Sequence, residues 1–297
     1  MQGVLVAGST GYLGKYVTRE FKRHGYWVRA LARNPKKLEE TGPFLEPAVR
    51  DQIDEVFVGE ATRPETLTGL CKGVEAVFSS LGITRQKEEY TFTEVDYQAN
   101  KNILELALAS GVKKFIFVSV AGGKQLRNID VIDARERLVD ELHNSKLDYT
   151  IIRPTGYFSD MTEFLNMAVS GRVYLIGHGE FRINPIHGAD LARVCIDAVK
   201  GSEKEMEAGG PETFTYEEVA ELAFSVLGKE PKITHIPAPP YSLAVKLMYP
   251  FVSSRTYTIS KFYATVAQMD CVTPPYGTHT LEDYFKEIAP AVGGGGP

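Results

Sequence analysis

The chain has 297 residues, of which 43% are hydrophobic and 24% charged, and its net charge is −5. This composition is typical of a globular protein with a sizeable core, and the negative charge argues against a nucleic-acid-binding face. The cysteines, Cys71, Cys195 and Cys271, are too scattered for a disulfide framework or a metal site. We expect a reduced, cytoplasmic protein without a bound metal, a signal peptide or a transmembrane segment.

Short apolar runs alternate with amphipathic stretches over the first half of the chain. The predicted strands cover residues 3–8, 27–33, 55–60, 76–82, 113–120 and 147–154. The predicted helices cover residues 14–25, 64–73, 96–111 and 131–142. This alternation is typical of parallel strands joined by right-handed helical crossovers. We therefore predict an α/β fold with a doubly wound parallel sheet, in which ligands lie beyond the carboxyl ends of the strands.

The pattern loosens after residue 155. Further elements are predicted as a short strand at 172–177 and helices at 185–201, 216–228 and 280–290, with Thr215 and Thr280 as N-caps of the last two. We predict a dinucleotide-binding domain over 1–155, a C-terminal substrate lobe over 156–290, and a flexible tail over 291–297.

The stretch 241–263 is rich in aromatic residues. It suits a cover for a flat apolar substrate, and equally a core or a partner interface. An interfacial membrane helix is disfavoured, because prolines would break it and its basic face is thin.

A glycine-rich loop follows the first predicted strand and precedes the first helix. Gly8, Gly11 and Gly14 are spaced for a tight turn, a close approach of pyrophosphate and close helix–strand packing. The alternative is a structural turn without a ligand. The residues expected to line the loop are Thr10, Tyr12 and Leu13. A phosphate would lie at the helix N-terminus, where N–H groups and the helix dipole favour an anion.

The end of the second strand distinguishes NAD from NADP. An acidic residue here would bind a ribose 2′-hydroxyl, but the sequence has Arg33, with Lys36 and Lys37 shortly after it. A guanidinium binds a 2′-phosphate in bidentate fashion. We therefore expect NADP(H) as the cofactor, with a solvated basic turn as the alternative.

Several segments together resemble an atypical short-chain dehydrogenase/reductase. They are "GSTGYLG", "LARNP", "VGEAT", "DYQANKNILELALASGVKKFIFVS" and "LDYTIIRPTGYF". The resemblance covers about residues 3–200 and is nearest to the NmrA-like and isoflavone-reductase-like branch. "VDYQANKN", "RPTGYF" and "GGPETFTYEEVAELAFSVLGKEPKITHIP" are also similar to divinyl chlorophyllide 8-vinyl reductases, though these residues are mostly structural.

The resemblance implies a set of cofactor and substrate contacts. The implied cofactor contacts are Glu60, Ala61, Ser80, Leu81, Gly82, Pro154, Thr155 and Gly156. The relatives usually have Asp at the position of Glu60. Ser119 matches the catalytic serine, while Tyr157 and Phe158 would begin the substrate pocket. Tyr157 would also be able to replace a missing catalytic phenol.

The helix predicted at 131–142 is the unusual part of the resemblance. Counting back from "LDYTIIRP", Val131 and Arg135 occupy the positions of the Tyr-x-x-x-Lys pair. Val131 cannot donate a proton, and Arg135 keeps its proton near neutral pH. Arg135 therefore suits cofactor binding and electrostatic positioning. The alternative is that it pairs with acids of its own helix, namely Asp133, Glu136 or Asp140.

Two functions follow from these features. The first is an NADPH-dependent reductase of an apolar, conjugated small molecule, since a C=C or C=N acceptor tolerates the lack of a protein acid. The second is a non-catalytic, NmrA-like dinucleotide-binding redox sensor or assembly factor with a protein partner. A nucleotide-sugar epimerase is a weaker third. His187 is a candidate substrate contact, although a lone histidine is more often structural.

Overall fold

A computed structural model describes residues 2–83 and 90–293. The chain divides into two compact units, Met1–Arg153 with Leu191–Glu207 and Pro154–Asp190 with Ala208–Pro297. The domain boundary predicted at residue 155 stays a prediction. Of the predicted tail, residues 291–293 belong to a helix, and residues 294–297 lie outside the described residues.

The first unit contains a seven-stranded parallel sheet with the strand order β3-β2-β1-β4-β5-β6-β9. Its strands are β1 (Gly3–Ala7), β2 (Trp27–Ala32), β3 (Glu55–Val58), β4 (Ala76–Ser79), β5 (Lys114–Val118), β6 (Asp148–Pro154) and β9 (Glu205–Ala208). The predicted doubly wound α/β fold and its first six strands are confirmed. The edge strand β9 was not predicted. Strand order reverses between β1 and β4, which is where such sheets bind ligands.

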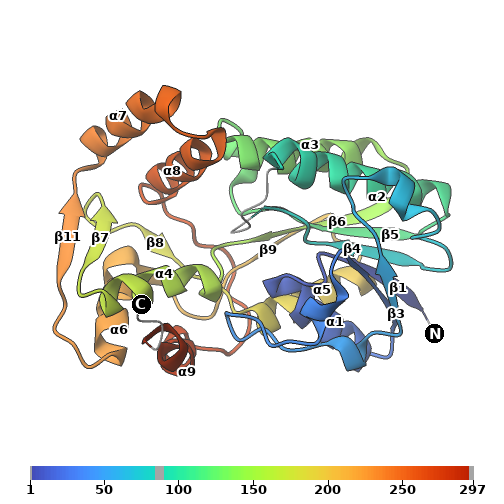
Figure 1. Ribbon diagram of the computed structural model, residues 1–297, viewed down its shortest axis with the longest axis horizontal. Helices are drawn as coiled ribbons and strands as arrows, with labels where there is room; N and C mark the ends of the chain where they lie inside the picture. Colours follow the sequence, from blue (N-terminus) through green and yellow to red (C-terminus); the bar gives the residue numbers. More distant parts are fainter. Residues whose placement is uncertain (1, 84–89, 294–297) are drawn as a thin grey trace. The chain divides into compact units, whose positions relative to one another are not determined.

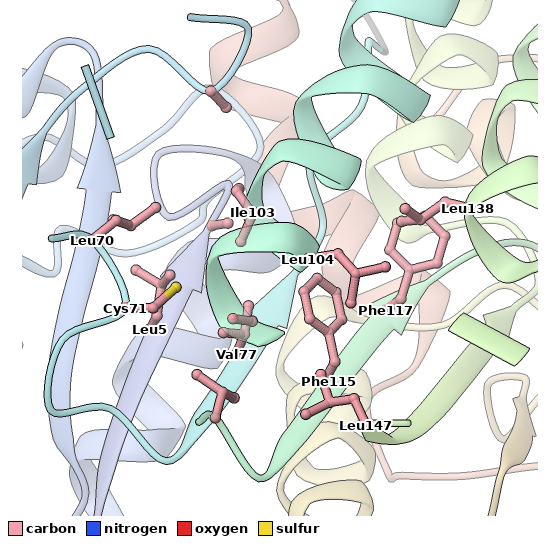
Figure 2. Close-up of a cluster of buried hydrophobic side chains, with 14 of the residues drawn as sticks. Leu5, Leu70, Cys71, Val77, Ile103, Leu104, Phe115, Phe117, Leu138 and Leu147 are labelled. Carbon is pink, nitrogen blue, oxygen red and sulfur yellow. The ribbon is translucent and has the colours of Figure 1, made fainter. Parts of the chain in front are cut away.

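Helices cover both faces of this sheet (Figure 1). Helices α2 (Asn100–Ala109) and α3 (Asp130–Asn144) lie on one face, and α1 (Tyr12–Arg23) and α5 (Gly188–Lys200) lie on the other. Figure 2 shows the buried cluster beneath α2 and α3, where Leu104 and Leu138 approach Phe115 and Phe117 of β5. This packing fixes both helices against β5.

Two predicted helices of this unit differ from expectation. The predicted helix 64–73 is only a 3₁₀ turn, η3 (Pro64–Leu67), because Gly69 and Gly73 adopt positive φ values of 84° and 76° that end it. The helix predicted to begin at residue 96 starts earlier, as a π-helical segment, η4 (Thr93–Ala99), and continues as α2. The remaining short helices are η1 (Pro35–Leu38), η2 (Arg50–Gln52) and η5 (Gly123–Leu126).

The second unit combines short sheets with a helical cluster. β7 (Val173–Ile176) pairs in parallel with β11 (Ile233–Ile236), and β8 (Arg182–Ile183) pairs antiparallel with β10 (Phe214–Thr215). The helices are α4 (Phe158–Val169), α6 (Tyr216–Val226), α7 (Ala238–Met248), η6 (Tyr249–Phe251), α8 (Ser254–Val266) and α9 (Leu281–Gly293). The predicted caps are confirmed, since the Thr215 and Thr280 hydroxyls accept backbone N–H groups three residues ahead.

The 241–263 region is not one continuous helix, because α7 ends at Met248 and α8 begins at Ser254, with Pro250 between them. α7 begins with proline in its first turn, and Pro250 lies at the start of η6. Proline fits there because first-turn N–H groups have no partner within the helix. Among the described residues, no helix is both long enough and apolar enough to cross a bilayer.

Candidate coenzyme and active site

The glycine loop joins β1 to α1 in a conformation that depends on two of its glycines. Gly8 has φ +87°, and a Cβ there would lie 2.9 Å from the Ser80 hydroxyl oxygen. A Cβ on Gly14 would lie 2.0 Å from the Gly8 carbonyl oxygen. A Cβ on Gly11 would meet only that oxygen within 4 Å, at 3.3 Å. Gly8 and Gly14 are thus required by the fold, and Gly11 leaves space where a ligand would approach.

The start of α1 fits a phosphate. Gly11 is its N-cap, without a side-chain cap, and the first turn carries no acidic residue. The first N–H groups of a helix then remain available to an anion. Of the other predicted loop residues, Thr10 is half-buried, Leu13 is buried, and Tyr12 packs edge-on against Tyr16.

A carboxylate from another part of the chain lies beside the basic turn that follows β2. An Arg33 guanidinium nitrogen lies 3.4 Å from a carboxylate oxygen of Glu60, which follows β3. Asn34 accepts the Lys36 N–H and so caps η1, leaving Lys36 and Lys37 exposed. The predicted 2′-phosphate residues therefore lie together, but Glu60 is directed to Arg33. The sequence around β2 could not predict this contact, because Glu60 follows the neighbouring strand β3.

Arg135 is held at the carboxyl edge of the sheet. Its guanidinium donates to the Val118 carbonyl at the end of β5, at 3.0 Å, and lies 2.9 Å from a carboxylate oxygen of Asp96 in η4. The other Asp96 oxygen accepts the Ile83 N–H at 3.0 Å. A Cβ on Gly82 would lie 1.9 Å from an Arg135 nitrogen, so only glycine fits between them.

This geometry corrects the alternative pairing for Arg135. Its acidic partner is Asp96 from a different helical segment, and Asp140 instead pairs with Arg127 at 2.5 Å. Glu136 pairs with Arg153. Arg135 is therefore not part of a solvated helix face. Val131, four residues earlier, presents no proton-transferring group on the same side of α3.

Asp96 is completely buried. Burial raises its pKa to about 6, while the Arg135 charge and the Ile83 N–H act in the opposite direction. π-helical segments are frequent at functional sites, and here the segment presents this carboxylate to Arg135. A role for Asp96 was not predicted from the sequence. The signal that could have identified it is an acidic residue at a helix position where the apolar pattern predicts burial.

Asn100 fastens η4 to the end of β4. Its amide donates to the carbonyls of Leu81, Val95 and Asp96, and its oxygen accepts the Ser79 hydroxyl. The predicted cofactor contact Leu81 is therefore fixed by a buried side chain. Asn102, two residues further along, donates to the Ala61 carbonyl at 2.9 Å.

Lys15 is a further residue that sequence reasoning missed. It directly follows Gly14, and its buried ammonium donates to the Glu40 carbonyl at 2.6 Å. Burial lowers the pKa of Lys15. This contact ties the first turn of α1 to the segment after the basic turn.

Ser119 lies in a second buried network. Its hydroxyl donates to Glu136 at 2.6 Å, and Glu136 also receives two hydrogen bonds from Arg153, at 2.6 and 3.1 Å. Arg153 also donates to Glu205 of β9 at 2.9 Å. The single hydroxyl hydrogen of Ser119 is thus directed to Glu136, and the Ser119 oxygen accepts a hydrogen bond from Arg153 at 3.5 Å.

The remaining predicted site residues belong to the second unit. Pro154 ends β6, the Thr155 hydroxyl donates to the Asn184 carbonyl, and Gly156 follows. The Tyr157 N–H donates to Asp160 as α4 begins. These residues are neighbours in the chain and belong to the second unit, whereas the coenzyme loop, Ser119 and Arg135 belong to the first.

Phe158 and His187 contact each other inside the second unit. Phe158 is buried and packs edge-on against the His187 ring at 5.5 Å. The same imidazole accepts the Ala189 N–H and stacks on His279 at 4.2 Å. His187 therefore has structural contacts, and its role toward a substrate stays a prediction.

Comparison with known proteins agrees with this geometry. Residues 8–201 match the NAD(P)H-binding family. The chain therefore belongs to this family. It is 28% identical to divinyl chlorophyllide a 8-vinyl-reductase of Arabidopsis thaliana, over 96% of this chain and 76% of that protein. It is 26% identical to photosystem II assembly factor Ycf39 of Trieres chinensis, over 79% of this chain and 72% of that protein. The predicted resemblance is thereby confirmed.

Solved structures give the same fold. An NADPH-dependent quinone oxidoreductase of Escherichia coli, QOR2, solved with NADPH, superposes with a TM-score of 0.72, covering 97% of this chain and 99% of that one. The sequences are only 18% identical, so this similarity concerns the fold. The chain is thus an NAD(P)H-binding protein with the fold of these structures.

Proposed function

We propose that the protein is an NADPH-dependent reductase of an apolar, conjugated small molecule that accepts hydride at a C=C or C=N bond. The observation that carries this proposal is that Arg135, at the lysine position of the Tyr-x-x-x-Lys pair, is held by the buried carboxylate of Asp96. Arg135 keeps its proton near neutral pH. It is suited to orient and to stabilise charge, and unsuited to protonate a product.

The residues of the first unit fit an NADPH molecule. The uncapped start of α1 would hold the pyrophosphate, Arg33 and Lys37 the 2′-phosphate, and Glu60 and Ala61 the adenine side. Ser80, Leu81 and Gly82 would border a ribose, whose hydroxyls Arg135 would orient. When bound, the coenzyme supplies a hydride at its nicotinamide ring.

The acceptor class follows from the side chains that lie near Arg135. The Ser119 hydrogen is donated to Glu136, and Val131 carries no polar atom. Reduction of a ketone needs an acid at the oxygen, whereas a conjugated C=C or C=N spreads the incoming charge and takes its proton from water. Positioning in a dry site then contributes most of the rate. Tyr157 is the alternative proton donor, and Tyr157, Phe158 and His187 are the candidate substrate contacts. Pro154, Thr155 and Gly156 would contact the coenzyme.

Isotope transfer tests this proposal. The protein is incubated with NADPH deuterated at C4 and with enones, iminium dyes and vinyl tetrapyrroles. With enones and vinyl tetrapyrroles we expect one deuterium on the carbon distal to the activating group and one hydrogen from solvent on its neighbour. With iminium dyes we expect one deuterium on the iminium carbon and no added proton. Arg135→Lys serves as the matched variant, because charge and reach are nearly kept, and should retain most turnover. Reduction of simple ketones alone would overturn the proposal.

A second function has its own support. The similarity to photosystem II assembly factor Ycf39 and the engagement of Ser119 with Glu136 favour a non-catalytic dinucleotide sensor or assembly factor with a protein partner. This function predicts tight NADPH binding in calorimetry with no oxidation of NADPH by any acceptor of the panel. That result would replace the reductase with the sensor.

A further inference from the structure

Apolar side chains are concentrated on one short exposed segment of the second unit. Leu243 and Leu247 on α7 and Tyr249 and Phe251 on η6 are 56%, 64%, 61% and 86% exposed. We call these four residues the α7–η6 patch. Exposed apolar residues normally occur singly, but these four lie within nine consecutive positions. α7 and α8 pack side by side in this region (Figure 1).

α7 is apolar on both of its sides. Val245 is only 4% exposed and anchors the helix to its own unit. Leu243 and Leu247 are four residues apart and share a face, which lies roughly opposite Val245 at about 100° per residue. A helix that is apolar all round is normally buried on both sides. The outward face of α7 therefore has the character of a contact surface.

The end of the patch is fixed in an outward position. The Tyr249 ring packs edge-on against Tyr257 of α8 at 4.8 Å, and Ser253 caps α8 by accepting the Thr256 N–H. Pro250 fixes the backbone between Tyr249 and Phe251. These contacts hold Phe251 away from the unit, where its ring meets solvent.

The sequence segment that contains the patch is basic, which indicates the charge of its partner. Residues 231–269 contain four basic residues, Lys232, Lys246, Arg255 and Lys261, and no Asp or Glu, although the whole chain has a net charge of −5. Lys246 lies three residues after Leu243 and so on the same side of α7. Apposing this segment with its equivalent in a second copy would bring like charges together. An anionic surface has the complementary charge.

We infer that the α7–η6 patch binds the surface of an anionic lipid bilayer. Leu243, Leu247 and Phe251 would enter the boundary between headgroups and acyl chains, Tyr249 would lie at headgroup level, and Lys246 would extend to the lipid phosphates. This binding is peripheral, and it is independent of the proposed reductase activity.

Vesicle co-sedimentation of the full chain, without coenzyme, tests this inference. The chain should sediment with vesicles of phosphatidylcholine mixed with phosphatidylglycerol, and far less with phosphatidylcholine alone. Added salt should weaken binding, because it screens Lys246 and its basic neighbours. Leu247→Ser with Phe251→Ser should reduce binding by about tenfold or more, since apolar insertion scales with buried area. Lys246→Glu should reduce binding to the anionic vesicles only.

Val58→Ser is the matched control, because Val58 on β3 is 63% exposed, almost as much as Leu247, and lies outside the patch. Its vesicle binding should equal that of the wild type, and equal thermal unfolding of all variants would show that they fold. Failure of the wild type to bind anionic vesicles, or an equal loss in Val58→Ser, would overturn the inference. So would concentration-dependent self-association that Phe251→Ser abolishes, since the patch would then bind a second copy.

Discussion

Two buried charge networks meet on consecutive residues of α3, and they differ in how completely their charges are paired. Glu136 accepts hydrogen bonds from two guanidinium nitrogens of Arg153 and from the Ser119 hydroxyl. Arg135, the preceding residue, has one carboxylate partner, Asp96, and one carbonyl. Fully satisfied buried networks rigidify a fold. A buried carboxylate with a raised pKa instead resembles a tuned functional group.

The difference teaches that position in a family pattern and role in the structure can diverge. Ser119 matches a catalytic position, yet its hydroxyl belongs to the more completely satisfied network. Arg135 replaces the usual lysine and lies beside Gly82, one of the expected cofactor contacts. We therefore infer that Glu136 has mainly a structural role and Arg135 a functional one. Three experiments test that division, and a fourth tests the coenzyme preference.

The largest effects are expected from removing one charge of each network. Glu136→Ala leaves Arg153 buried without its main partner, and Arg135→Ala leaves Asp96 in the same condition. Each should lower the free energy of unfolding by about 3–5 kcal/mol in denaturant titrations. Only Arg135→Ala should also weaken NADPH binding by the folded protein, by on the order of tenfold for a lost charged hydrogen bond. An equal loss of NADPH affinity in both variants would contradict the division.

The next effect is a pH dependence contributed by Asp96. Its folded pKa of about 6 exceeds the unfolded value near 3.8, so between these values the folded state holds the extra proton. The Asp96 contribution to stability is therefore highest at low pH and falls as the pH rises through this window. The unfolding free energy of Asp96→Asn relative to wild type should rise by about 3 kcal/mol between about pH 3 and pH 7. A flat difference would mean that Asp96 is ionised throughout.

A smaller effect concerns coenzyme preference. Arg33→Asp should shift binding from NADPH toward NADH by about 1.5–3 kcal/mol, because it removes the partner of the 2′-phosphate and supplies an acceptor for a 2′-hydroxyl. Glu60→Gln is the complementary variant and should favour NADPH, since it removes the carboxylate beside Arg33. Titration calorimetry measures both. Wild-type protein that binds NADH more tightly than NADPH would refute the assignment.

The smallest effect is expected for Ser119→Ala. Arg153 continues to satisfy Glu136, so the unfolding free energy should fall by only about 1 kcal/mol, with turnover of a conjugated acceptor nearly unchanged. An order-of-magnitude loss of kcat at unchanged stability would show that the Ser119 oxygen also contacts the substrate, as the family resemblance implies.

The sheet was predictable because its signals are local. β1 and β5 are apolar runs that are buried over their whole length, and Thr215 with Glu218 forms a capping pattern readable within four residues. β9 was missed because its sequence, "EMEA", shows no apolar run; its place depends on pairing with β6, more than fifty residues earlier.

The site was predictable where backbone geometry alone determines it. Gly8 and Gly14 follow from the turn itself. The partners of the charged residues were not predictable, because Arg135 and Asp96 are 39 positions apart in the printed sequence, and Arg33 and Glu60 come from different strands. Sequence spacing suggests only acids of the same helix, such as Asp133, as ion-pair partners for Arg135. The actual partner, Asp96, is brought close by the folding of the sheet and its helices.

The π-helical start of α2 sets the register of the carboxylate that faces Arg135. A π turn contains one more residue than an α turn. Removing one residue between Asp96 and Asn100 would let the segment close as an α-helix, and would turn Asp96 about the helix axis by about 100°. The carboxylate would then leave Arg135 although every charged residue was retained. A sequence alignment with a one-residue gap in this segment would accordingly place another residue at the position of Asp96 and misidentify the partner of Arg135.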